Sequence, residues 1–131
     1  MSIETIFETM DYGTAPEDST IALKWIADHG GISGPYINGK WGPFREDLLV
    51  CYPATGEKLA GMTISSANEV ATAVAAARKA QPLWEASGGP ARARVLYAIS
   101  RLMQKHSRLL SVMESLDNGK PIRESRDIDI P

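Results

Sequence analysis

Apolar positions in the second half of the chain recur every three or four residues, which is the period of an α-helix. The first run of this kind follows Ser66 and Glu69, whose spacing is that of a capping box. Its apolar face consists mostly of alanines, so we expect a closely packed partner on that side. Because Pro82 lacks a backbone N–H, the sequence predicts that this helix ends near Gln81.

Two further helical runs follow in the chain. Residues 88–90 (Gly-Gly-Pro) open the first of them, because proline suits an early helical position. Ser107 is expected to cap the second, and Gly119 to end it in the left-handed conformation that glycine adopts without a steric clash. The second half of the chain therefore predicts three helices, each with one apolar face.

Residues 36–64 have a β pattern instead. Asn38-Gly39 is a strong signal for a hairpin, because a type I′ turn needs positive φ at both central positions. Side chains alternate from Leu48 to Tyr52, and residues 58–64 are typical of a return strand after a turn. These features predict a small antiparallel meander.

The first third of the chain has weaker patterns. Residues 1–12 are expected to form an extended arm that needs a surface to lie on. Residues 14–17 have the pattern of a helix start, with Thr14 as the cap and Glu17 completing a capping box. A short apolar stripe at residues 22–26 follows, and two glycines at residues 30–31 are expected to end this helix.

Length and composition fit one soluble globular domain, with 131 residues, 44% hydrophobic and 23% charged. No apolar run approaches the roughly 20 residues of a membrane-spanning helix, and the N-terminus lacks the pattern of a secretory signal. Cys51 is the single cysteine, so no intrachain disulfide framework forms and a reducing cytoplasm is expected. The formal net charge of −2 argues against a dedicated nucleic-acid binder.

The predicted sheet is too small to cover the predicted helices. Three apolar helix faces need partners, and the strands between residues 36 and 64 are few and short. The chain therefore has the pattern of the outer layer of something larger.

No catalytic constellation stands out from the residues themselves. Residues 34–41 come within one position of a phosphate-binding loop, but Trp41 replaces the required Ser or Thr, and a hairpin is the favoured interpretation. No Gly-x-Gly-x-x-Gly dinucleotide fingerprint occurs. Cys51 lies in an alternating strand, so we expect a buried structural thiol rather than a nucleophile. His29 and His106 lack the partners of a metal site.

Two groups of charged residues are candidates for binding, although solvated helix faces explain both. The basic group lies along one predicted helix and comprises Arg92, Arg94, Arg101, Lys105 and Arg108. The acidic group lies near the end of the chain and comprises Glu124, Asp127 and Asp129.

The order of the short motifs nevertheless resembles the N-terminus of the aldehyde dehydrogenase superfamily. The motifs are YINGKW at 36–41, YPATGE at 52–57, an alanine-rich helix that ends in Trp84, ARARVL at 91–96 and LDNGKP at 116–121. Tyr52 departs from the family, which usually has Asn before the Pro-Ala-Thr-Gly turn. FETMDYG at 7–13 is similar to the longer N-terminus of the family-16 branch.

The resemblance implies an α/β fold, of which this chain would be the N-terminal part. Residues 1–34 would form an arm and a short helix, and residues 35–131 an incomplete cofactor-binding domain. The implied activity is oxidation of an aldehyde to a carboxylic acid through a cysteine thioester, with NAD or NADP as acceptor. The family's catalytic cysteine and glutamate lie beyond position 131, so this segment alone is expected to be inactive and to bind neither cofactor. The implied partners are the remainder of the enzyme and further copies of it, in the cytoplasm.

One binding site is implied within the chain. Many members of the family hold a monovalent cation beside the first strands, and the matching positions here are Val50, Cys51 and Asp129. Two other interpretations stay open: a non-catalytic helical interaction module, and a fragment of a pseudo-enzyme that has lost its catalytic cysteine.

Overall fold

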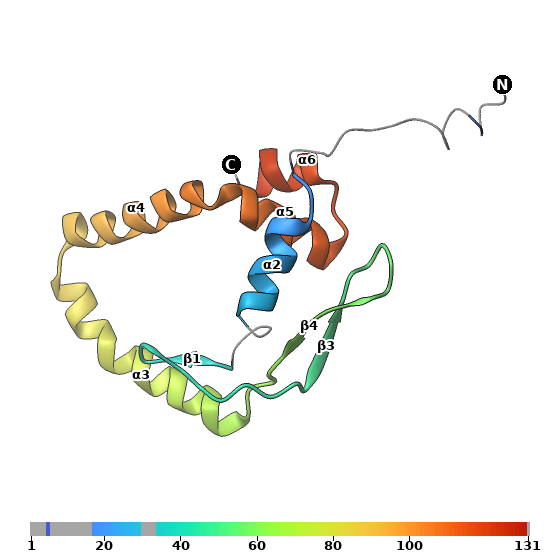
Figure 1. Cartoon of the computed structure of the whole chain (residues 1–131). Coiled ribbons are helices and arrows are strands. Elements are labelled where there is room, and N and C mark those ends of the chain that lie inside the picture. Colours follow the sequence, from blue (N-terminus) through green and yellow to red (C-terminus); the bar gives the residue numbers. More distant parts are fainter. Residues whose placement is uncertain (1–4, 6–16, 30–33, 131) are drawn as a thin grey trace.

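The structure is a computed structural model that describes residues 5, 17–29 and 34–130 (Figure 1). Its helices are α2 (Thr20–Asp28), α3 (Ala67–Ala86), α4 (Gly89–Lys105), α5 (Ser107–Asn118) and α6 (Ile122–Glu124), followed by the π-helical turn η1 (Ser125–Asp129). Its strands are β1 (Tyr36–Ile37), β2 (Lys40–Trp41), β3 (Leu48–Cys51) and β4 (Lys58–Met62).

The strands form two separate antiparallel pairs, β1–β2 and β3–β4, so the prediction of one continuous meander was wrong. Pro43, in the segment between β2 and β3, has no N–H to donate to a ladder, and no strand forms there. The first pair is the predicted hairpin, with φ of 51° at Asn38 and 77° at Gly39. Positive φ at both central positions is what its type I′ turn requires.

The N-terminal helix begins later than predicted. Glu17 precedes α2 and therefore does not complete a capping box. The Asp18 carboxylate instead accepts the Thr20 N–H at 2.8 Å. Thr14 and the glycines at 30–31, which were expected to cap and to end this helix, lie outside the described residues. Thr5, the one described residue of the arm at residues 1–12, is helical rather than extended.

Helix α3 has the predicted start but not the predicted end. The Ser66 hydroxyl accepts the Glu69 N–H and the Glu69 carboxylate accepts the Ser66 N–H, so the capping box is confirmed. Pro82 does not end the helix, which continues to Ala86. Proline removes only one helical donor. The last carbonyls are then covered by Arg92 of α4, whose guanidinium donates to the Glu85 oxygen at 3.0 Å.

The ends of α4 and α5 follow the sequence more closely. Gly88, with φ of 78°, precedes α4 and Pro90 stands at its first positions. Ser107 is the first residue of α5 and makes no capping bond, so that prediction was wrong; the chain bends at His106 instead. Gly119 ends α5 in the left-handed conformation, as predicted.

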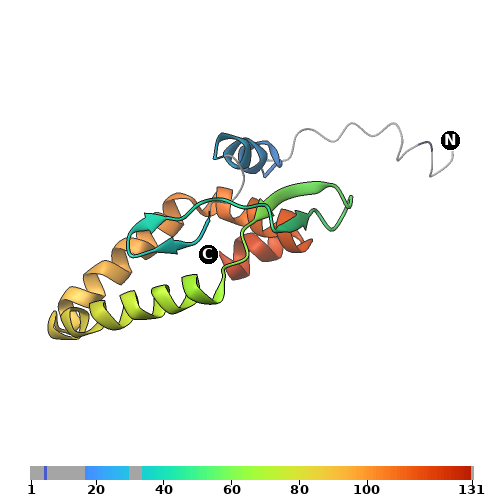
Figure 2. The ribbon, with the colours of Figure 1, turned by 90° about the horizontal axis from the view of Figure 1, so that it is seen from below.

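The core is small and lies at one end of the molecule. Ala22 of α2 packs against Val112 and Leu116 of α5, and half-buried side chains such as Tyr52 surround them. Helices α3 and α4 extend away from this core as a long bent arm (Figures 1 and 2). Twenty-one large hydrophobic side chains of the described residues are exposed. The uncovered helix faces expected from the sequence are therefore present.

Candidate functional site

Cys51 is exposed, so the prediction of a buried thiol was wrong. The register between β3 and β4 shifts between Val50 and Cys51, and Cys51 lies opposite Lys58. Because the sheet has only two strands, this irregular end has no second layer over it. The period of the sequence gave the strand correctly, but it did not reveal that one face would be left uncovered.

The segment that resembles a phosphate-binding loop is the β1–β2 hairpin and its approach, as favoured from the sequence. A side chain at Gly34 would collide with the backbone oxygens of Gly42 and Pro43. Gly34 is therefore needed for close packing of the chain on itself. No helix N-terminus follows this loop to bind a phosphate.

The proposed cation ligands lie on separate elements. Val50 and Cys51 are in β3, and Asp129 is at the end of η1. One oxygen of Asp129 accepts a hydrogen bond from Lys120 Nζ at 2.6 Å, and this contact raises the pKa of Lys120. Within the described residues, no three His, Cys, Asp or Glu side chains are grouped as a metal site. The cation site at Val50, Cys51 and Asp129 stays a prediction.

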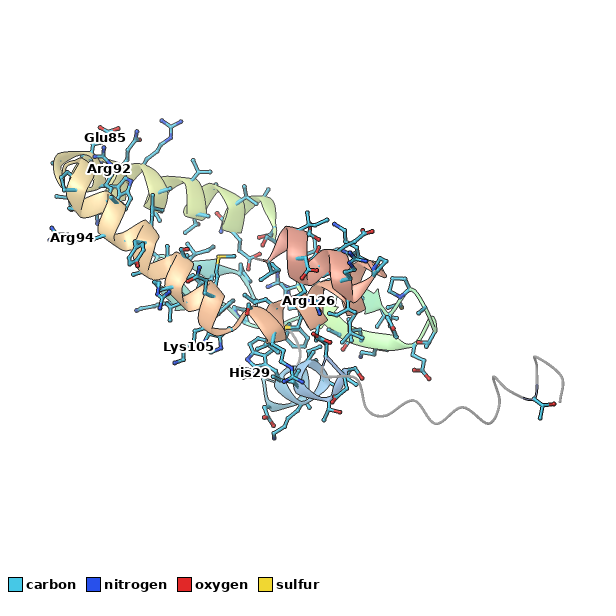
Figure 3. The ribbon with its side chains drawn as sticks, turned by 90° about the horizontal axis from the view of Figure 1, so that it is seen from above. His29, Glu85, Arg92, Arg94, Lys105 and Arg126 are labelled. Atoms are coloured by element: carbon cyan, nitrogen blue, oxygen red, sulfur yellow. The ribbon has the colours of Figure 1, made fainter. Side chains whose placement is uncertain are left out.

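The acidic group near the end of the chain takes part in ion pairs. Arg126 donates to both oxygens of Asp127, at 2.7 and 3.1 Å, and to Glu17 at 2.8 Å (Figure 3). Arg126 thereby lowers the pKa of Asp127. The contact with Glu17 joins residues 109 positions apart and fixes the start of the described N-terminal segment against η1.

Both histidines have structural positions. The ring of His29 stacks on Trp25 with centroids 4.0 Å apart, and its Nδ1 lies 2.7 Å from the Trp25 carbonyl oxygen. His106 occupies the bend between α4 and α5. Neither belongs to a metal-ligand group among the residues that the structure describes.

Arg45 is the centre of the most connected polar cluster. Its guanidinium donates to the two oxygens of Glu69 at 3.2 and 3.1 Å and to the Ile64 carbonyl at 3.0 Å. The hydrogen bonds from Arg45, followed by those from Ser66, lower the pKa of Glu69 to about 2. The cluster joins the start of α3 to the β3–β4 pair. Sequence reasoning found Glu69 but missed Arg45, because the partners are 24 positions apart and no local pattern links them.

The largest uncovered apolar concavity among the described residues lies where three helices meet. We call it the three-helix groove; its volume is about 410 Å³, and its walls come from α2, α4 and α5. It is lined by Trp25, Ile99, Leu102, Met103, His106, Leu109, Leu110 and Met113. No charged side chain lines it, so this surface suits an apolar partner rather than a catalytic role.

The aldehyde dehydrogenase family model matches residues 42–131. The chain belongs to the aldehyde dehydrogenase family. It is 43% identical over 94 residues to a betaine aldehyde dehydrogenase of Rhizobium leguminosarum bv. trifolii, a match that covers 72% of this chain and 19% of the relative. Betaine aldehyde dehydrogenase 1 of Rhizobium meliloti is 42% identical, and that of Sinorhizobium fredii 40%, with the same coverage.

The chain thus spans about one fifth of the length of the relatives that it matches. It corresponds to the N-terminal segment of an aldehyde dehydrogenase, which confirms the resemblance seen in the short motifs. The partial α/β fold expected on that basis, with two small antiparallel sheets and five helices, is also confirmed. Among the described residues, no helix has the length and apolar character needed to cross a membrane.

Proposed function

We propose that this chain is the N-terminal part of an NAD(P)-dependent aldehyde dehydrogenase and acts there as a scaffold. The observation that carries the proposal is the family match over residues 42–131. The whole enzyme would oxidise an aldehyde to a carboxylic acid, and the bound nicotinamide would accept the hydride. The nucleophilic cysteine and the glutamate that activates water would come from the part of the enzyme beyond residue 131.

The residues of this chain do not fit a dinucleotide on their own. A dinucleotide needs a glycine-rich turn that leads into a helix N-terminus, and the described glycine-rich segment leads into a hairpin. We therefore route no chemical step through these residues. Their contribution would be to hold helices α3 and α4, whose apolar faces are open, against the remainder of the domain.

We propose betaine aldehyde as the first substrate to test, because the relatives named above are betaine aldehyde dehydrogenases. A homo-oligomer in the cytoplasm is proposed as well, on the family resemblance alone.

Two measurements test the proposal. The longer protein that carries this segment should reduce NAD or NADP in the presence of aldehydes, followed by the absorbance of the reduced nicotinamide. The 131-residue chain alone should show neither turnover nor saturable heat on calorimetric titration with either cofactor, because hydride transfer requires both reactants held in one closed site. Saturable binding by the short chain would show that the cofactor site has been misplaced.

A non-catalytic interaction module is the second candidate function. It is favoured by the many exposed apolar side chains, which usually mark a surface that binds a protein partner. A longer protein that folds and binds the nicotinamide cofactor but oxidises no aldehyde would favour this candidate, including its pseudo-enzyme form.

A further inference from the structure

The three-helix groove leaves large apolar side chains open to solvent. Trp25 is 36% exposed, Leu102 57% and Met103 45%. Leu109 and Met113, at its floor, pack against the buried core of Ala22, Val112 and Leu116. The floor is thus rigid while the walls are uncovered, a combination typical of a docking surface.

Basic side chains stand beside this groove. Arg101, Lys105 and Arg108 alternate along the chain with its lining residues, and none forms an ion pair with a described residue. Lys105 lies at the end of α4 near His29 of α2 (Figure 3). Arg108 contributes to the lowered pKa of Asp18, after the hydrogen bonds from Thr20. Positive charge therefore faces the side of the groove where α2 runs.

The first twelve residues carry a matching pattern. Ile3, Phe7 and Met10 are spaced by four and three positions, which places them on one face of a helix. The acidic residues Glu4, Glu8 and Asp11 repeat that spacing one position later, and no lysine or arginine occurs in this segment. Thr5, the described residue among them, is helical.

We propose that residues 1–12 dock as an amphipathic helix in the three-helix groove of the same chain, with their apolar face on Trp25, Leu102 and Met103 and their carboxylates toward Lys105 and Arg108. The sequence supplies both complements, an apolar stripe and an acidic stripe beside it.

The connection is long enough for this arrangement. Trp25 lies five residues into α2, roughly 8 Å along the axis from Thr20. Residues 13–19 form the link and can span up to roughly 25 Å when extended. The arm can therefore turn back along α2 and reach the groove without unfolding any described helix.

Cysteine cross-linking tests the proposal in the intact chain. In a Cys51→Ser background, we expect Phe7→Cys with Met103→Cys to form an intramolecular disulfide rapidly under mild oxidation, because a disulfide requires Cα atoms roughly 4.4–6.8 Å apart. Phe7→Cys with Leu83→Cys is the matched control, since Leu83 is 79% exposed on α3, outside the groove. Equal rates for the two pairs would overturn the proposal. Dimers linked between chains on a non-reducing gel would do the same, because they place the arm on a second copy.

Charge reversal tests the acidic stripe separately. Lys105→Glu with Arg108→Glu should slow the cross-link several-fold, and Glu4→Lys with Glu8→Lys should restore it. Arg94→Glu, on the same helix but away from the groove, should leave the rate unchanged. A rate that is insensitive to the reversal, or that the compensating change does not restore, would refute the charge pairing that orients the arm.

Discussion

Two leucines measure how much of the hydrophobic core this chain contains. Leu116 is 6% exposed and packs with Ala22 and Val112, whereas Leu83 on α3 is 79% exposed. We predict that Leu116→Ala strongly destabilises the chain and that Leu83→Ala is close to neutral. The two substitutions remove the same atoms, both from helices, so the difference reports burial alone.

The magnitudes follow from the burial of each side chain. Truncation of a fully buried leucine costs about 2–5 kcal/mol, as lost transfer free energy plus the cavity that remains. The core around Leu116 has only three buried members and can partly relax, so we expect about 2–3 kcal/mol. An exposed position such as Leu83 should change the free energy of unfolding by no more than about 0.5 kcal/mol.

Urea unfolding followed by far-ultraviolet circular dichroism, at low protein concentration, measures both values. Equal losses for the two variants would refute the distinction between the small core and the uncovered arm. In a longer protein that includes the rest of the family's domain, Leu83→Ala should become costly, approaching about 2–5 kcal/mol, because the missing layer would then bury this side chain. A neutral effect in that longer protein would show that the α3 surface at Leu83 stays free.

Four further outcomes are expected. Because Arg45 and Ser66 hold the pKa of Glu69 at about 2, below its ordinary 4.5, its stabilisation should be complete above pH 4.5 and lost toward pH 2; Glu69→Gln should flatten acid-denaturation curves there. The exposed Cys51 should react with a disulfide reagent as fast without denaturant as with it, and Cys51→Ser should change the unfolding free energy by less than about 0.5 kcal/mol. Gly119→Ala should cost about 1–2 kcal/mol by the same urea assay, because φ is 75° there. Sedimentation should show self-association of the chain that rises with concentration, since its apolar faces are open.

Each of these outcomes has a clear opposite. An acid-denaturation curve that Glu69→Gln leaves unchanged would show that the Arg45 contact does not persist in solution. A thiol that reacts only after unfolding would place Cys51 under cover. A neutral Gly119→Ala would contradict the left-handed helix end, and a monodisperse monomer with a sharp thermal transition would contradict the uncovered faces.

The sequence by itself determined the features whose signals are local. The capping box at Ser66, the Asn38-Gly39 hairpin and the left-handed end at Gly119 each depend on a few neighbouring residues, so their patterns predicted the structure correctly. The family was also recognisable, because five short motifs occur in one order and spacing. The shortage of sheet relative to helix indicated the uncovered faces before any contact was known.

Only the tertiary structure decided the features that depend on distant residues. Helix α3 passes Pro82 while Arg92, from the next helix, covers its last carbonyls. Arg45 finds Glu69 across 24 positions, and no period in the sequence joins them. Cys51 is exposed because a register shift ends a sheet of two strands, whereas alternation alone suggested burial. Local patterns specify which elements form, but burial depends on which elements meet, and that is decided by packing across the whole chain.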